Sequence, residues 1–238
     1  MAASDGACCM KLKRITDWLD RKLDLAAFDD ASNNGLQIAR EEGDVKVVAF
    51  AVDGSVASVK AAIEAGAQLL VVHHGISWGG GIKRIVNGEY EVIKAAMEGN
   101  LALYAAHLPL DANESVGNNW ELARYLGLER IEKAFSYHGN VIGVTGYNAH
   151  GKKIGVCSGG AGEFAVAAKE LGCDLYVTGE ANWGERIAAE NVGMPMVCAG
   201  HYETETFGVK ALSKAMAKEL KIKTVCCMYN GEGKLEVV

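Results

Sequence analysis

The chain has 238 residues, of which 50% are hydrophobic and 23% are charged, a composition typical of a globular protein with one large domain or two small ones. Its formal net charge of −6 argues against a general binder of nucleic-acid backbones, which needs a basic surface. No apolar run approaches the ~20 residues of a membrane-spanning helix, so no membrane association is predicted.

The start of the chain is expected to be a disordered leader over residues 1–9, because it lacks the basic-then-apolar order of a signal peptide. Residues 10–25 carry apolar side chains at helical spacing, which predicts an amphipathic helix. SNNGLQI at 32–38 is typical of a loop leading into a short strand. The seven cysteines show no CxxC spacing, and several lie in apolar runs. Their number and placement predict a reducing, cytoplasmic location.

Strand-like and helix-like segments alternate in the next part of the chain. Three strands are expected at 46–54, 67–72 and 101–107, joined by helices at 55–66 and 89–99. Alternation of this kind indicates a parallel sheet with helices on its faces.

The second half of the chain repeats this pattern. A shift of 106 residues, from 64 to 170, aligns EAGAQLLVVHHG (64–75) with ELGCDLYVTGEA (170–181). The neighbouring strands correspond in the same order, 46–54 with 152–160 and 101–107 with 194–201. We therefore predict an α/β fold built from two similar, duplicated halves.

The expected boundaries follow from this repeat. The first α/β half is assigned to 10–128 and the second to 154–238. The segment 129–153 between them alternates apolar and polar residues with Gly, Asn and His punctuation, which predicts a β-hairpin or irregular strands.

Polar residues follow the predicted strands in both halves, where parallel sheets bind ligands beyond the carboxyl ends of their strands. Both third strands end in His-x-x-x-carboxylate, within HLPLD and HYETE. Folding the halves about a pseudo-two-fold axis would aim both sets at one shared cleft. The candidate site residues are His73, His74, His107 and Asp111 in the first half, and Glu180, His201 and Glu205 in the second.

The chemistry of this set predicts a metal site. Imidazole and carboxylate without thiolate suit Zn²⁺, Mn²⁺, Fe²⁺ or Co²⁺. The donors exceed what one tetrahedral ion needs, so two divalent transition-metal ions per chain are expected, bridged by carboxylates. Two such ions lower the pKa of a shared water and polarise a phosphoryl or carbonyl oxygen, which predicts hydrolysis.

Structural alternatives exist for single elements of the set. His201 and Glu205, four residues apart, would also suit an exposed pair on a helix surface. Adjacent strand residues such as His73 and His74 point to opposite faces unless a turn lets them converge. The duplication of the pattern favours the metal interpretation over these alternatives.

Other residues have open roles. His107 is a candidate catalytic residue that would serve equally well by orienting a metal ligand, and Glu180 is a candidate for moving a proton. His138 and His150 are interpreted as structural histidines. In SWGGG at 77–81, Trp78 either stacks on a base or sugar or packs in the core, and the glycines favour a mobile loop.

The motifs VVHHG, HLPLD, TGE and AGHYETE, in this order over essentially the whole chain, resemble the Nif-three-like family, whose members are often labelled GTP cyclohydrolase 1 type 2 homologues. The resemblance implies two similar α/β halves (the Nif-three-like fold) facing a shared metal-binding cleft, with His107 and Glu180 lining it. It also implies a toroidal homohexamer. The implied ligands of a dinuclear metal centre are His73, His74, Asp111, His201 and Glu205.

Two departures from the family pattern bear on the site. Ser32-Asn33 stand where the family usually has Asp-Asn before the GLQ, which predicts no acidic role at that position. HLPLD replaces a more polar HTNLD-type sequence, keeping His107 and Asp111 but losing two polar side chains.

The leading functional prediction is a metal-dependent hydrolase of a small phosphorylated or nucleotide-like substrate. The alternative is a non-enzymatic, metal-stabilised ring that binds a protein partner or single-stranded nucleic acid. Ring opening of GTP ranks third among the interpretations, because it requires a purine pocket and none is evident in the sequence.

Overall fold

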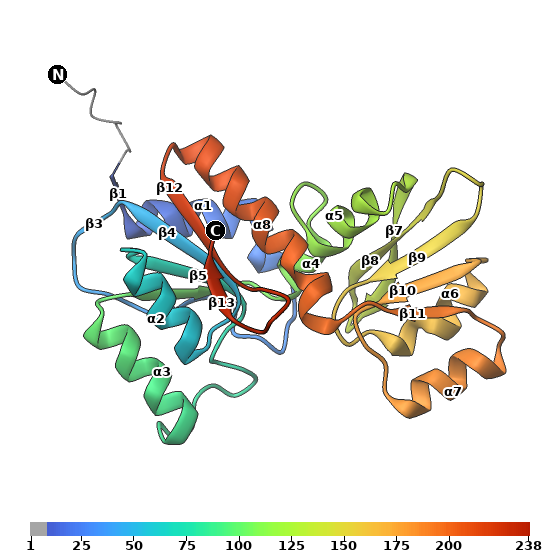
Figure 1. Cartoon of the computed structure of the whole chain (residues 1–238), viewed down its shortest axis with the longest axis horizontal. Helices are drawn as coiled ribbons and strands as arrows, with labels where there is room; N and C mark the ends of the chain where they lie inside the picture. The colour runs from blue at the N-terminus through green and yellow to red at the C-terminus, as the bar shows by residue number, and fades with distance from the viewer. Residues whose placement is uncertain (1–8) are drawn as a thin grey trace. The chain divides into compact units, whose positions relative to one another are not determined.

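The structure is a computed structural model that describes residues 9–238 in two compact units (Figure 1). The first unit holds the chain up to His107 together with Leu212–Val238, and the second holds Leu108–Ala211. The leader expected at 1–9 lies outside the described residues except for Cys9. No helix within 9–238 is long and apolar enough to cross a membrane.

The first unit is built on a six-stranded sheet in the order β13-β12-β4-β5-β6-β2. Strands β12, β4, β5 and β6 run parallel, and β2 and β13 are antiparallel edges. A separate two-stranded ribbon joins β1 to β3. The strands are β1 (Met10–Lys11), β2 (Gly35–Ile38), β3 (Asp44–Val45), β4 (Val47–Asp53), β5 (Leu69–His74), β6 (Ala102–Ala105), β12 (Lys223–Tyr229) and β13 (Leu235–Val237).

Helices cover both faces of this sheet. On one face, α2 (Val56–Glu64) and α3 (Asn87–Glu98) pack against alternate residues of β4, β5 and β6. The intervening strand residues, such as Phe50 and Val71, are buried as well, so the opposite face is also covered. There α1 (Leu12–Leu23) and the end of α8 (His201–Leu220) lie together, because Trp18 Nε1 and Lys22 Nζ both donate to Glu219.

The second unit contains a five-stranded sheet in the order β11-β10-β9-β8-β7. Strands β9, β10 and β11 are parallel, and β7, β8 and β9 are antiparallel neighbours. Leu122 and Ala123 of α5 pack on β8 and β9, while α6 and α7 lie on the other side of the sheet (Figure 1). The elements are α4 (Leu108–Ala112), α5 (Asn118–Tyr125), β7 (Glu129–Tyr137), β8 (Asn140–Tyr147), β9 (Lys153–Cys157), α6 (Ala165–Glu170), β10 (Leu175–Thr178), α7 (Trp183–Asn191) and β11 (Met196–Cys198), with single 3₁₀ turns at Leu25–Ala27 and Gly162–Phe164.

The duplication predicted from the sequence is confirmed. The run β4-α2-β5-α3-β6 in the first unit has the same order and parallel pairing as β9-α6-β10-α7-β11 in the second. The expected amphipathic helix is α1, which buries Ile15, Leu19 and Leu23. The expected hairpin is β7-β8.

The compact units divide the chain at other positions than the expected halves. The segment 129–153 is part of the second sheet rather than a connection, since β8 pairs with β9. The end of the chain, expected in the second half, belongs to the first unit because β12 pairs in parallel with β4, from Lys223 opposite Val47 onward. This pairing extends a sheet whose strands come from both ends of the sequence.

Candidate metal centre

Three histidines cluster at the carboxyl ends of β5 and β6 in the first unit. His73, His74 and His107 each offer one ring nitrogen, and these nitrogens lie within 4.8 Å of one another. The ring centroids are 4.6 Å apart between His73 and His74 and 5.1 Å apart between His73 and His107. We call these three residues the histidine group.

Each ring of the histidine group is held through Nδ1. His73 Nδ1 lies 3.1 Å from the carbonyl oxygen of Ala106, which can only accept, so Nδ1 carries the proton. His74 Nδ1 lies 2.8 Å from Asp53 Oδ1, and His107 Nδ1 lies 2.9 Å from an Asp30 oxygen. In a neutral ring held in this way the lone pair is on Nε2, the arrangement that orients metal-binding histidines.

The end of β5 explains how two adjacent histidines converge. His74 is paired with Asp53 across the β4–β5 ladder and bonds to that side chain, while His73 bonds toward Ala106, just beyond β6. The two rings are thus fixed by opposite neighbours of the same strand, yet remain adjacent at the edge of the sheet. His73 is fully buried and His74 is partly exposed.

Asp30 supplies an acidic side chain close to Ser32, where the sequence predicts no acidic role. Its carboxylate accepts from His107 Nδ1, from the Ser32 backbone N–H at 3.0 Å and from Asn34 Nδ2 at 2.8 Å. Burial alone raises the pKa of Asp30, but the hydrogen bond and charge of His107, with the hydrogen bonds of Asn34 and Ser32, outweigh it and lower that pKa to about 2. The acidic role therefore exists two residues before Ser32.

In the second unit, His201 and Glu205 form a pair in the first turn of α8. His201 Nε2 lies 3.2 Å from Glu205 Oε1, and His201 Nδ1 lies 3.0 Å from Glu180 Oε1. Hydrogen bonding to Glu205, with a further contribution from Glu180, outweighs burial and raises the pKa of His201 to about 9. Glu205 is only 3% exposed, so the pair is not the surface feature that its spacing also allowed.

Asp111 is buried in α4 of the same unit. Its Oδ1 accepts from Asn118 Nδ2 at 2.9 Å and from Ser158 Oγ at 3.2 Å. Ser158 is followed by Gly159, where a side-chain Cβ would overlap the Glu205 carboxylate. One short loop after β9 therefore contacts both carboxylates predicted to bind metal in this unit.

We expect Gly159→Ala to destabilise the protein more than Gly172→Ala. Both glycines have a positive φ, 68° and 75°, so alanine carries the same backbone strain of roughly 1–2 kcal/mol at each. At position 159 the new methyl group would also overlap Glu205 Oε1, whereas at position 172 it would meet nothing within 4 Å. Displacing a buried carboxylate adds about 1–3 kcal/mol.

Urea denaturation of the two variants measures this difference. Equal loss of unfolding free energy in both would show that Glu205 is not held against Gly159.

The sequence also singled out two further histidines and one tryptophan. His138 and His150 are exposed and lie in turns of the second unit. Trp78 is 39% exposed rather than buried in the core, and its ring lies 5.0 Å from that of His107 and 6.2 Å from that of His74.

Besides Asp30 and Asp53, two further polar residues of the first unit were not predicted, although both lie in the SNNGLQI motif. Asn34 Oδ1 accepts from the His107 backbone N–H at 2.8 Å. Gln37 Oε1 accepts from the backbone N–H of Ile76 at 2.7 Å and fixes the chain just after the two histidines. The dense polar run from Asp29 to Asn34 was the available signal, since turn-forming side chains often bond nearby backbone.

Comparison with known proteins gives a consistent result. The family model for Duf34/NIF3 (NGG1p interacting factor 3) matches residues 10–151 and 129–231. The chain belongs to the Duf34/NIF3 family. The predicted family resemblance is thereby confirmed.

Relatives in this Duf34/NIF3 family match along nearly their whole length. A GTP cyclohydrolase 1 type 2 homolog of Pyrococcus horikoshii is 36% identical over 245 aligned positions, covering 91% of this chain and 97% of the relative. One from Archaeoglobus fulgidus is 37% identical, with the same coverage. A crystal structure of a Thermus thermophilus protein superposes with a TM-score of 0.79 at 30% identity, covering 91% of this chain and 97% of that one.

Proposed function

We propose that this Duf34/NIF3 protein is a dinuclear metal-binding protein and a metal-dependent hydrolase of a small phosphorylated or nucleotide-like substrate. The observation that carries the proposal is the histidine group, in which every Nδ1 is tied to an oxygen acceptor. Imidazoles whose Nε2 lone pairs are directed by such contacts are typical donors of a transition-metal site.

The donor chemistry of both units fits such ions. We propose His73, His74, Asp111, His201 and Glu205 as ligands of two divalent ions drawn from Zn, Fe, Mn or Co. When bound, such ions lower the pKa of a coordinated water and polarise a phosphoryl or carbonyl oxygen. The name of the Pyrococcus relative, a GTP cyclohydrolase homolog, supports a nucleotide-like substrate.

His107 in the first unit and Glu180 in the second are the proposed catalytic residues. The ring of His107 lies next to those of both proposed ligands of the first unit, which places its Nε2 to contact substrate or metal. Glu180 Oε1 lies 3.0 Å from Nδ1 of His201, and the Glu180 side chain is 63% exposed to solvent. We propose that Glu180 both orients His201 and moves a proton during hydrolysis.

We expect about two transition-metal ions per chain after expression in metal-supplemented medium. The reason is that the donors in the two units together exceed the need of a single ion. Elemental analysis of the purified protein, before and after dialysis against a chelator, measures the stoichiometry. Absence of bound metal after metal-replete expression would remove the basis of the proposed function.

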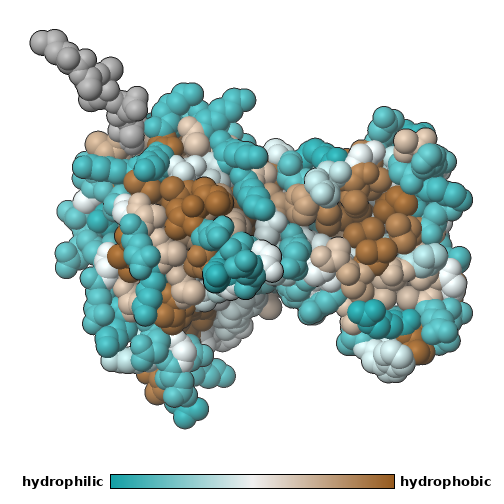
Figure 2. Space-filling view, viewed as in Figure 1, coloured by the Kyte–Doolittle hydropathy of each residue, from teal (hydrophilic) through white to brown (hydrophobic). Residues whose placement is uncertain are grey.

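We also propose that the chain forms a homo-oligomer, a hexamer as the family resemblance implies, in the cytoplasm. Figure 2 shows hydrophobic residues gathered over strands of each unit, and exposed apolar side chains of the second unit include Val141 and Val197, 43% and 46% exposed. The buried thiols of Cys157 and Cys173 suit a reducing location. Sedimentation equilibrium is expected to give six times the chain mass, and a monomer would contradict the proposal.

A further inference from the structure

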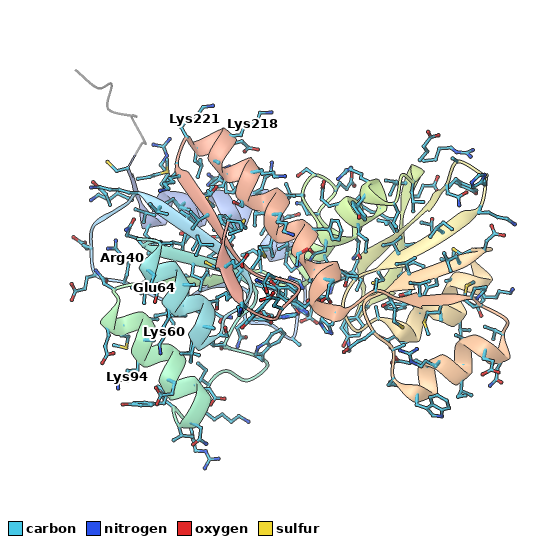
Figure 3. All side chains as sticks on the ribbon, in the orientation of Figure 1. Arg40, Lys60, Glu64, Lys94, Lys218 and Lys221 are labelled. Carbon is cyan, nitrogen blue, oxygen red and sulfur yellow. The ribbon has the colours of Figure 1, made fainter. Side chains whose placement is uncertain are left out.

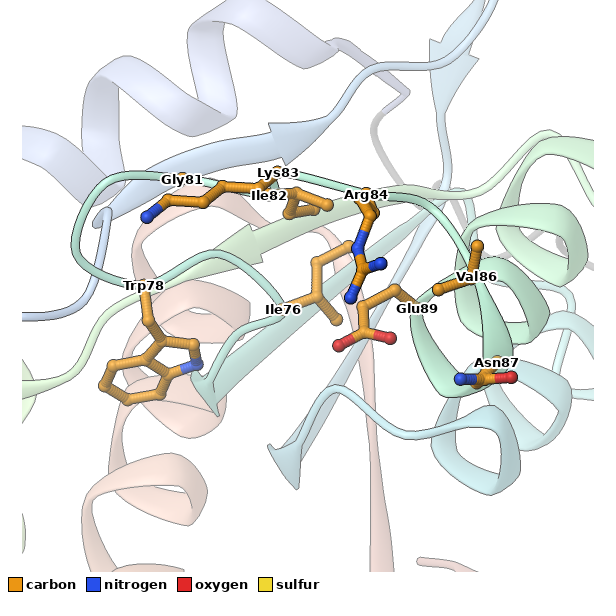
Figure 4. A pocket seen from close by; sticks show the side chains of 9 residues that line it. All are labelled: Ile76, Trp78, Gly81, Ile82, Lys83, Arg84, Val86, Asn87 and Glu89. Atoms are coloured by element: carbon orange, nitrogen blue, oxygen red, sulfur yellow. The ribbon is translucent and has the colours of Figure 1, made fainter.

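A pocket of about 460 Å³ opens beside the histidine group in the first unit (Figure 4). It is formed by the loop between β5 and α3 and by the first turn of α3. Its volume lies within the range of pockets that hold small organic ligands. None of the predicted metal ligands lines it, so it is a separate compartment next to the metal donors.

Trp78 forms a wall shared by the pocket and the histidine group. Its indole lines the pocket, and its ring lies edge-on to that of His107 at 5.0 Å. The orientation of the indole is fixed because Nε1 donates to the Gly75 carbonyl oxygen at 2.9 Å. A ligand that contacts the histidine group and extends into the pocket therefore passes this aromatic face.

The pocket is lined by two cationic side chains and one carboxylate. Lys83 and Arg84 both line it, and neither forms a hydrogen bond or ion pair with any residue in the part of the chain that the structure describes. Glu89 contributes a carboxylate, toward which Arg84 points in Figure 4. In a chain with a net charge of −6, a local excess of positive charge in a pocket favours an anionic ligand.

The same pocket also exposes apolar surface. Trp78, Ile82 and Val86 are 39%, 37% and 47% exposed, and all three line it. Large apolar side chains that face solvent around a concave site indicate a ligand with an apolar part. An aromatic wall, aliphatic side chains and two cations together suit a molecule with a planar ring and a phosphate.

We propose that this pocket binds the phosphate of a nucleoside monophosphate-like substrate through Lys83 and Arg84, with the planar base stacked on Trp78 next to the histidine group. Base–aromatic stacking and charge-assisted hydrogen bonds to phosphate are the interactions these side chains offer. The inference rests on the proposed function for the identity of the ligand as a substrate. It assigns Trp78, Lys83 and Arg84 as residues that determine which substrate binds.

Isothermal titration of the full, chelator-treated chain with adenosine 5′-monophosphate tests the proposal without relying on metal or activity. Adenosine and ribose 5-phosphate are titrated separately, because each carries only one of the two recognised parts. We expect each fragment to bind at least about tenfold more weakly than the nucleotide, since stacking and phosphate contacts each contribute at this order.

Two double variants each remove two positive charges, one pair inside the pocket and one pair outside it. We expect Lys83→Gln/Arg84→Gln to weaken nucleotide binding at least about tenfold, and Trp78→Leu to do the same. The control is Lys60→Gln/Lys218→Gln, which removes two cations on α2 and near the end of α8 (Figure 3), and it should bind like the wild type. Melting temperatures close to that of the wild type show that the exposed substitutions leave the fold intact.

Several outcomes would overturn the proposal. These are no nucleotide binding by the wild type, equal binding by the pocket variants, or equal weakening by the control variant. A single-stranded oligonucleotide that binds far more tightly than the mononucleotide, with a steep salt dependence, would replace a small substrate by a nucleic-acid strand. If the pocket results hold while elemental analysis finds no metal, the binding site stands and the proposed function fails.

Discussion

Replacing His74 with alanine is expected to lower the metal content of the protein by at least one ion per chain. His74 is one of three imidazoles whose ring nitrogens lie within 4.8 Å, so its loss removes a donor that no neighbouring side chain replaces at that position. Polarisation of the substrate oxygen by a metal ion stabilises the transition state by several kcal/mol, and each 1.36 kcal/mol changes the rate by about a factor of ten. Hydrolysis is therefore expected to fall by about 10³-fold or more.

The control for this variant is His150→Ala. His150 is exposed in a turn of the second unit and contributes to no group of potential ligands among residues 9–238. The His74 side chain is 22% exposed, so its truncation leaves no sealed cavity and should cost little stability. Elemental analysis of both variants decides the matter, because unchanged metal content in His74→Ala would exclude His74 as a ligand.

The sequence predicted the fold well because its signals were local and repeated. The strand expected at 46–54 is β4, and the strand expected at 67–72 is β5, which continues through both histidines. The helix between them begins after Ser55, whose side chain caps it. These features depend on residues close in sequence, where periodicity and capping chemistry are informative.

The course of the chain end was harder to predict. β12 pairs with β4 across more than half of the sequence, and an apolar strand carries no information about which sheet it joins. The strand-like run TVCCMY can be recognised in the sequence, but the strand with which it pairs cannot. Because of this long-range pairing, the two units meet after His107 and again before Leu212, and not at the boundary of the sequence repeat.

For the candidate site, the sequence indicated the donors but missed the residues that hold them. Histidines after strands are conspicuous, and the structure groups His73, His74 and His107. Asp30 and Ser158 bond to candidate ligands from distant loops, and Asp53 does so from the end of β4. Such contacts depend on loop conformations and strand pairing that a motif does not specify. The structure thus adds a layer of orienting groups to the predicted set.

Replacing Asp30 with asparagine is expected to weaken metal binding about 10- to 100-fold, the usual effect of losing an orienting group next to the ligands. Asp30 orients His107, whose ring lies beside those of the proposed ligands His73 and His74. The Asp30 carboxylate accepts three N–H groups, from His107, Ser32 and Asn34. An amide has only one accepting oxygen, so its NH₂ group would face one of these donors. Asn34 cannot flip to relieve the conflict without losing the bond from the His107 backbone N–H to its Oδ1.

Two measurements on Asp30→Asn separate an orienting role from a loss of structure. Competition with a chelating dye gives the metal affinity, and ¹⁵N NMR of the histidine rings reports whether His107 still carries its proton on Nδ1. Asp17→Asn is the control, because among residues 9–238 Asp17 pairs only with Lys13 on the surface of α1, and removing its charge should change neither readout. Metal affinity within about threefold of the wild type, with His107 in the same tautomer, would show that the Asp30 charge does not orient the ring, and the hydrogen bond would then be structural alone.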